Sequence, residues 1–300
     1  MSKKNLKLFI ILIILIGVAY LYQGPFKNWE EKSGSPDNFL SSVNVEEINK
    51  IEITRSEGNS MLIKSDDKWK VEGDGDFYIS ENLAINLSQV LKDASESEFD
   101  LISSNVNKKS EFKTDISGIK VKFYQDSDLK ADFIIGTLGS DFVSTYVSKV
   151  EINETYLVKA NLFGAFSIQD WRDKTIFKSN KDNINKIRFQ YPNREFSIEK
   201  KDDKWVSGEQ ELDVEKVDEV LTVMANLSAI NIPEQNFDGT GLEKNLIIIE
   251  AAGDFINNTI MVGEVNDNGQ YYAKKGDSDN IYLITEAQRD ILDKKIQDLE

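Results

Sequence analysis

The chain has 300 residues, a formal net charge of −16, and neither cysteine nor histidine. The missing residue types exclude disulfides, thiolate nucleophiles, and any catalytic triad or zinc site that requires imidazole. Acidic residues are spread along the whole sequence, and such a surface repels phosphate backbones, so we expect no nucleic-acid partner. The apolar share of 40% and the charged share of 29% are typical of folded globular domains.

The beginning of the chain predicts a membrane anchor. Three lysines within the first seven residues precede an uncharged, mostly aliphatic run from Leu8 to Tyr22. Counted from Leu6 to Phe26, the segment is long enough to cross a bilayer, with Lys7 reaching back to the interface. Because basic residues favour the cytoplasmic side, we expect a single-pass protein with a cytoplasmic N-terminus and its bulk in the periplasm or outside the cell.

A cleaved signal peptide is the alternative interpretation of this segment. No small-x-small cleavage site follows the apolar run, and a cysteine for lipid attachment is absent. We therefore predict an uncleaved signal-anchor helix over residues 1–28 that contacts the lipid bilayer. A linker over residues 29–44 follows, because Gly34-Ser35-Pro36-Asp37 is typical of turns and tethers.

Two tetrads occur twice in the sequence at one constant spacing. Ile48-Asn49-Lys50-Ile51 recurs as Ile184-Asn185-Lys186-Ile187, and Asp66-Asp67-Lys68-Trp69 recurs as Asp202-Asp203-Lys204-Trp205. The offset is the same for both pairs (184 − 48 = 136 and 205 − 69 = 136). Two matches at one offset predict a duplicated folding unit.

The first predicted lobe covers residues 45–174. Ile51 and Ile53 alternate with polar neighbours and predict the first of three meandering strands. Ser80 is a suitable N-cap for a helix with an apolar stripe that ends at Ala94. Later strands are expected at 119–123, Phe133–Ile135, Phe142–Val147 and Tyr156–Val158, with a closing helix from Leu162 to Trp171.

The second predicted lobe covers residues 175–300 and repeats this order. Asp213 is expected to cap its long helix, and Leu246 to Ile249 reads as a strand buried on both faces. Thr285 with Gln288 predicts a capping box for a last helix that extends to Leu299. The predicted fold class is α+β: a transmembrane helix followed by two tandem, duplicated β-rich lobes, each with one long helix after a three-strand meander.

Few residues suggest chemistry. Trp69 and Trp205 could stack on a ligand, but their matching places in two meanders favour a role in the core. Four acidic pairs could in principle perform general acid–base catalysis. These pairs are Asp66 with Asp67, Asp74 with Asp76, Asp126 with Asp128, and Asp277 with Asp279. Aspartate is favoured in turns for backbone reasons, so we predict no catalytic, cofactor-binding or metal-binding residue and no enzymatic activity.

The succession of motifs resembles a known family. An N-terminal anchor, an Ile-x-Lys-Ile strand, an Asp-Asp-Lys-Trp turn, an Asp-capped helix and Trp171-Arg172-Asp173-Lys174 occur in the order typical of the bacterial domain-of-unknown-function 4340 family. The resemblance extends from Val45 to Leu299. It implies an accessory component of an ABC-type transport system of the gliding-motility kind. Locally, Arg172 and Asp173 are expected to form an ion pair or cap where the lobes join.

The working hypothesis is a membrane-anchored extracytoplasmic protein whose lobes bind or scaffold a partner. An ABC transporter permease or another envelope protein is the expected partner. One alternative is a cell-envelope hydrolase that uses a carboxylate pair. The other is a glycan- or surface-binding module, which would require Tyr271 and Tyr272 to be exposed in a row.

Overall fold

A computed structural model of the chain describes residues 38–73 and 75–300. The predicted anchor over residues 1–28, which includes the apolar run Leu8–Tyr22, lies outside these ranges. Residues 29–37 of the predicted linker lie outside them as well. Within the described ranges, no helix is both long enough and apolar enough to cross a membrane.

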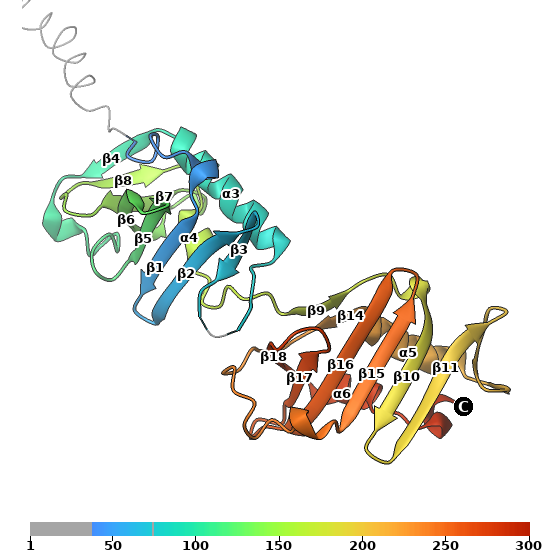
Figure 1. The fold of residues 1–300 in the computed structure, drawn as a ribbon. Coiled ribbons are helices and arrows are strands. Elements are labelled where there is room, and N and C mark those ends of the chain that lie inside the picture. Colours follow the sequence, from blue (N-terminus) through green and yellow to red (C-terminus); the bar gives the residue numbers. More distant parts are fainter. Residues whose placement is uncertain (1–37, 74) are drawn as a thin grey trace, which may run out of the picture. The chain divides into compact units, whose positions relative to one another are not determined.

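The fold is α+β and contains two antiparallel eight-stranded sheets (Figure 1). We call the first sheet with α3 and α4 the first lobe. Its elements are β1 (Lys50–Arg55), β2 (Gly58–Ser65), β3 (Lys68–Val71), α3 (Glu81–Glu96), β4 (Phe99–Ser103), β5 (Ile119–Gln125), β6 (Asp128–Leu138), β7 (Thr145–Lys149), β8 (Thr155–Val158) and α4 (Leu162–Phe166).

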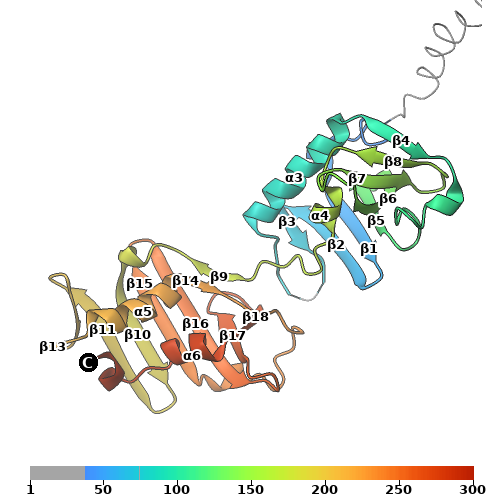
Figure 2. The same cartoon turned by 180° about the vertical axis from the view of Figure 1, so that it is seen from behind.

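The second sheet with α5 and α6 forms the second lobe. Its elements are β10 (Ile184–Tyr191), β11 (Arg194–Lys201), β12 (Lys204–Ser207), β13 (Gln210–Glu211), α5 (Val214–Ala225), β15 (Ile247–Gly253), β16 (Ile256–Val265), β17 (Tyr271–Lys275), β18 (Ile281–Ile284) and α6 (Glu286–Leu292). Strands β9 (Thr175–Lys178) and β14 (Asn226–Ser228) pair in a separate two-stranded sheet. Figure 2 shows α5 and α6 on the same face of the second sheet.

The two large sheets share most of their strand order. The first runs β3-β2-β1-β5-β6-β7-β8-β4, and the second runs β13-β12-β11-β10-β15-β16-β17-β18. In each, a meander is followed by a helix, and a later strand, β5 or β15, pairs with the strand that began the meander. The sheets differ at their edges, because β4 is added at the end of the first sheet and β13 at the beginning of the second.

The repeated Asp-Asp-Lys-Trp tetrad forms the same hairpin turn in both lobes. The φ angles are 48° and 62° at Asp66 and Asp67, and 46° and 63° at Asp202 and Asp203. Each aspartate pair is the two-residue loop between paired strands. Positive φ at both central residues is the signature of a type I′ turn, which matches the twist of a β-hairpin. Turn geometry therefore accounts for these aspartates.

The predicted helix starts are confirmed. Ser80 Oγ accepts a hydrogen bond from the backbone N–H of Leu83 (3.3 Å), and Asp213 Oδ1 accepts from the N–H of Glu215 (2.8 Å). The capping box of Thr285 and Gln288 is also present. Each long helix buries one apolar stripe against its lobe. These residues are Leu87, Val90, Leu91 and Ala94 in α3, and Val217, Val220, Leu221 and Met224 in α5.

Both closing helices end earlier than predicted. Helix α4 ends at Phe166 rather than Trp171, and α6 ends at Leu292, with a separate 3-10 turn from Ile296 to Leu299. In each case, a side chain from the first strand of the same lobe binds the backbone just beyond the helix. These tertiary hydrogen bonds take up the backbone groups that a longer helix would have used.

Three further predictions are wrong in part. Strand β15 is buried on one face only, because Ile247 and Ile249 are buried while Ile248 is half-buried. Strand β7 begins at Thr145 and not at Phe142, whose φ is 59° in an exposed turn. Trp69 is only half-buried, whereas Trp205 is 6% exposed. Strand order does not explain this difference, because residues 77–79 hydrogen-bond to the outer side of β3 much as β13 pairs with β12.

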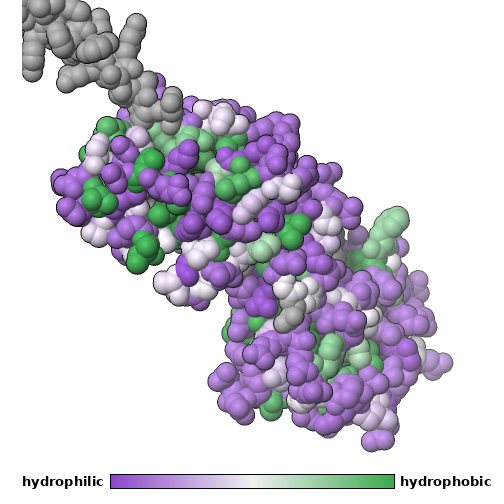
Figure 3. All heavy atoms as spheres, turned by 60° about the vertical axis from the view of Figure 1, so that its left-hand side comes forward, coloured by the Kyte–Doolittle hydropathy of each residue, from purple (hydrophilic) through white to green (hydrophobic). Residues whose placement is uncertain are grey.

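Hydrophilic residues predominate on the molecular face shown in Figure 3, where apolar residues lie in separate groups. Such dispersed apolar residues are normal on protein surfaces. The concave sites of each lobe, rather than a continuous apolar surface, are therefore the places to search for function.

Candidate functional site

The described acidic residues singled out from the sequence lie in or next to the connections between strands. Asp126 Oδ1 accepts a hydrogen bond from Asn49 Nδ2 (2.7 Å), and Asp128 pairs with Lys130 (3.5 Å). Asp277 and Asp279 each pair with a lysine of β17, at 3.3 and 2.9 Å. Asp74 lies outside the described residues. In the described part of the chain, no group of three or more acidic side chains is arranged to hold a metal ion.

The remaining residues noted in the sequence are placed as follows. Tyr271 and Tyr272 are both half-buried, and as neighbours on β17 they point to opposite faces of the sheet, so they form no exposed row. Arg172 forms the expected ion pair, but with Asp170 (2.9 Å). The Asp173 carboxylate accepts a hydrogen bond from the N–H of Thr175 (3.0 Å), which is a local turn contact.

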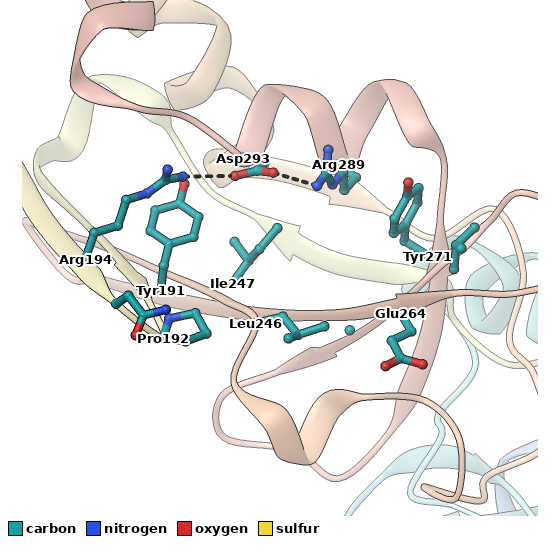
Figure 4. Close-up of a pocket in the computed structure, with 12 residues that line it drawn as sticks. Tyr191, Pro192, Arg194, Leu246, Ile247, Glu264, Tyr271, Arg289 and Asp293 are labelled. Carbon is teal, nitrogen blue, oxygen red and sulfur yellow. Dashed lines mark hydrogen bonds and ion pairs between the residues drawn. The ribbon is translucent and has the colours of Figure 1, made fainter.

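The second lobe contains a cavity of about 620 Å³ at one end of its sheet (Figure 4). The turn between β10 and β11, the start of β15, the end of β16, the start of β17 and helix α6 converge there. We call it the arginine pocket. It is lined by Tyr191, Pro192, Asn193, Arg194, Leu246, Ile247, Gly263, Glu264, Val265, Tyr271, Arg289 and Asp293.

Two arginines on one wall of the arginine pocket share a single carboxylate. Asp293 Oδ1 lies 3.4 Å from Arg194 Nη2, and Asp293 Oδ2 lies 2.6 Å from Arg289 Nη2. Figure 4 shows this chain of ion pairs above Ile247. Arg289 lies on α6, and Asp293 is the C-cap residue of that helix, one turn further along the chain. Asp293 therefore holds two guanidinium groups beside the cavity.

Aromatic rings hold the same arginines from the other side. The Arg194 guanidinium carbon is 3.8 Å from the centre of the Tyr191 ring, and that of Arg289 is 5.3 Å from the Tyr271 ring. Cation–π contacts of this kind contribute about 0.5–2 kcal/mol, more where water is excluded. Ring contact and ion pairing together restrict the positions of the guanidinium groups.

Tyr191 is fixed at its other end. Its hydroxyl donates to the carbonyl oxygen of Lys294 (2.6 Å) and accepts from the N–H of the same residue (2.9 Å). Burial raises the pKa of Tyr191, and the hydrogen bond from Arg194 only partly offsets this effect. The hydroxyl is therefore neutral at physiological pH and can donate to the backbone.

The charged groups of the arginine pocket are held in ion pairs. Burial lowers the pKa of Arg289, but the hydrogen bond to Asp290 and the charge of Asp293 outweigh it and leave the pKa above its usual value. Arg289 also pairs with Asp290 (3.0 Å), so Asp290 and Asp293 together balance the two lining arginines. Glu264, the other lining acid, is paired with Lys244 (2.5 Å), which lies outside the lining. Counted with these partners, the charged groups of the arginine pocket sum to zero.

The first lobe has a smaller cavity at the corresponding place. It measures about 240 Å³ and lies among the turn after β1, the start of β5, strand β6 and helix α4. Arg55 occupies this place, since its Nη1 donates to the carbonyl oxygens of Phe166 (3.1 Å) and Ile168 and its Nη2 donates to Ser60 Oγ (2.7 Å). The guanidinium of Arg55 is thus committed to the lobe's own backbone.

A family model with the description "Domain of unknown function (DUF4340)" matches residues 69–244, which is 176 of 300 residues (244 − 69 + 1 = 176). The chain belongs to the DUF4340 family. The matched region begins in β3 and extends into the second lobe as far as the 3-10 turn Leu242–Lys244. Neither the curated proteins nor the solved structures contain a significant match.

Sequence reasoning on this DUF4340 protein missed the arginine pocket. Of its lining, only Tyr271 was among the residues discussed for a ligand-binding role. Arg194 and Arg289 are 95 positions apart (289 − 194 = 95), and no motif joins them. The one available signal was the presence of arginines in a chain dominated by acidic residues. The fold was needed to bring them to one wall.

Proposed function

We propose that this DUF4340 protein is a membrane-anchored, extracytoplasmic binding protein that scaffolds a partner beside an ABC-type transport system. The observation that carries the binding role is the arginine pocket. It combines an apolar floor, two aromatic walls and two oriented cationic groups in about 620 Å³. Ligand sites are typically concave and largely apolar, with a few placed polar groups.

The location rests on the N-terminal sequence. Lysines followed by the apolar run Leu8–Tyr22 favour an anchor with the lobes on the far side of the membrane. The common strand order of the two sheets and the constant offset of the tetrads support descent of the lobes from one duplicated unit. The association with a transporter rests on the family resemblance alone.

The alternatives have less support. A carboxylate-pair hydrolase needs two acids that converge in a cleft, whereas the described pairs lie in turns and most of their members contact lysine or asparagine. A glycan-binding row needs Tyr271 and Tyr272 on one face, and successive residues of a strand face opposite ways. The binding and scaffolding role is therefore the function that we propose.

Cross-linking in native membranes followed by purification of the full chain tests this proposal. We expect a permease and an ATP-binding subunit to be enriched with the protein. The matched control keeps residues 1–37 and replaces the lobes with an unrelated domain, and it should lose both subunits. Recovery of the full chain only as a free monomer, or equal enrichment with the control, would contradict the scaffold role.

A further inference from the structure

We infer that strand β4 of the first lobe pairs antiparallel with β4 of a second copy of this chain. This inference goes beyond the proposed function and does not depend on it. Three observations carry it: an open sheet edge, an uncharged stretch with exposed apolar residues along that edge, and opposite charges at the two ends of the stretch.

The outer side of β4 is an open sheet edge. The strand is the last one of the first sheet and, among the described strands, pairs with β8 alone. Figures 1 and 2 both show it at the rim of the first lobe. Within the described residues, no other backbone segment hydrogen-bonds to its outer side. Unpaired N–H and C=O groups of this kind are a template for an additional strand.

The other sheet edges are covered or short. Phe77 and Ile79 form backbone hydrogen bonds with the outer side of β3 (2.8 and 2.9 Å). In the second sheet, Ile230 and Asn231 form backbone hydrogen bonds with the outer side of β18 (2.8 and 2.9 Å). Strand β13 has only two residues. Covering and shortening are common protections of sheet edges, and β4 has neither a covering segment nor so short a length.

An uncharged stretch follows the open edge. Residues 101–107 contain no charged side chain, although 29% of the chain is charged. Leu101, Ile102 and Val106 are exposed by 48%, 41% and 55%. A register shift between Leu101 and Ser103 interrupts the pairing with β8, but the stretch lacks the lysine or proline that often protects an edge. Two copies can therefore meet here without charge repulsion at the contact.

The charges at the ends of the stretch favour an antiparallel pair. The exposed acids Glu98 and Asp100 lie at its start, and the exposed Lys108 lies just after its end. In an antiparallel pair, the acidic end of each copy lies beside the lysine of the other, whereas a parallel pair brings like charges together. The midpoint between Glu98 and Lys108 is Ser103 ((98 + 108)/2 = 103), so we expect the two-fold axis near this residue. The sequence of β4 is thus complementary to itself.

The short edge predicts a weak dimer. Strand β4 has five residues, whereas stable interfaces involve about 20–30 residues a side. The Asn38 side chain donates to the carbonyl oxygen of Ser97 (2.8 Å), so residue 38 lies beside the start of β4. Residues 29–37 join this point to the proposed anchor. Anchoring of two copies in one membrane would raise their effective concentration at this edge.

Disulfide trapping in the full chain, purified in detergent, tests the pairing. The chain has no cysteine, so a single introduced cysteine reports on one position. Ser103→Cys places a thiol at the expected axis, and mild oxidation should give a covalent dimer, because a disulfide requires Cβ atoms about 4 Å apart. Ser140→Cys is the matched control, since Ser140 is an exposed serine of the same lobe, between β6 and β7. The dimer yield should be several-fold higher for Ser103→Cys.

Charge exchange then tests the orientation. In the Ser103→Cys chain, Glu98→Lys should lower the dimer yield about twofold to fivefold, because it replaces an exposed ion pair with like charges. Lys108→Glu alone should lower the yield similarly. The two changes together should restore it, since each end again faces the opposite charge of the other copy. Ile102→Lys should lower the yield as well, because a lysine on an edge strand opposes pairing.

Equal dimer yields for Ser103→Cys and Ser140→Cys would overturn the inference, and so would failure of the double charge exchange to restore the yield. Thermal unfolding of each variant confirms that it is folded before yields are compared. Cross-linking of Ser103→Cys only to a different protein in native membranes would assign the edge to another partner and overturn the second-copy assignment. Enrichment of transporter subunits tests the proposed function separately from each of these results.

Discussion

In each lobe a side chain of the first strand hydrogen-bonds the backbone after the closing helix, but the residue type differs between the lobes. The last residue of the first strand is Arg55 in one lobe and Tyr191 in the other (191 − 55 = 136), and each hydrogen-bonds the backbone just beyond the closing helix. Arg55 donates to the carbonyl of Ile168, and Tyr191 donates to that of Lys294 (294 − 168 = 126). The residues at each end of these contacts thus keep the offsets seen elsewhere between the repeats.

The difference between these contacts determines whether a cavity stays open. The forked guanidinium of Arg55 spreads over two carbonyls and a hydroxyl and occupies its site, and burial lowers its pKa. Tyr191 needs only one hydroxyl for the backbone, and its ring becomes a wall of the larger pocket. The cavity is accordingly larger in the second lobe, which is where we propose that a ligand binds.

The largest expected contrast concerns the repeated tryptophans. Trp205→Ala should cost about 3–5 kcal/mol of unfolding free energy, because a buried aromatic side chain is replaced by a cavity. Trp69→Ala should cost about half as much or less, since the half-buried ring already contacts water. Urea unfolding followed by far-UV circular dichroism measures both. Trp→Phe at each position is the matched control, and equal losses for the two alanine variants would contradict the energetic importance of the difference in burial.

Loss of the hydrogen bonds from Arg55 or Tyr191 to the backbone should give the next largest effect. Arg55→Ala removes hydrogen bonds to two carbonyls and should destabilise the first lobe by about 2 kcal/mol, whereas Tyr191→Phe should cost the second lobe about 1 kcal/mol. Hydrogen exchange of the amides of α4 and α6 assigns each loss to its lobe.

A control variant separates the contribution of Arg55 from that of its hydrogen-bond partner Ser60. Ser60→Ala removes only the hydroxyl that accepts from Arg55 and should have a smaller effect than Arg55→Ala. Faster exchange in α6 after Arg55→Ala, with α4 unaffected, would contradict the role of Arg55 in stabilising the end of α4.

Local patterns were sufficient for most of the fold. Alternation of apolar residues found the strands that begin each lobe, and Ser80, Asp213 and Thr285 correctly marked helix starts. Each of these signals depends on residues a few positions apart. The predicted transmembrane anchor over residues 1–28 lies outside the described ranges and stays a prediction.

Features set by distant residues could not be predicted in this way. Helices α4 and α6 end where Arg55 and Tyr191 bind the backbone, across 111 to 113 and 103 positions. Trp69 and Trp205 share the Asp-Asp-Lys-Trp sequence, and yet Trp205 is buried while Trp69 is half-buried. The arginine pocket was missed for the same reason, because its walls come from five separate elements.

The smallest predicted effect concerns the repeated hairpin turn, where substitutions in the two lobes should change stability equally. Asp67 and Asp203 occupy the second central position of two type I′ turns, with φ of 62° and 63°. Glycine at this position removes the side-chain strain of the left-handed conformation, a gain partly offset by the greater freedom of glycine in the unfolded chain. Asp67→Gly and Asp203→Gly should therefore each stabilise the protein by about 0.5 kcal/mol.

The two gains should be equal, because the contacts of these side chains contribute little. Asp203 lies 3.4 Å from Lys200, but its side chain is 97% exposed, and such ion pairs are weak. Alanine at either position should destabilise instead, since it keeps the left-handed strain and loses the aspartate's local hydrogen-bonding capacity. Thermal unfolding of the four variants measures these differences. Stabilisation by glycine in one lobe only would show that the turns carry unequal strain, and turn geometry would then no longer explain why the tetrad occurs twice.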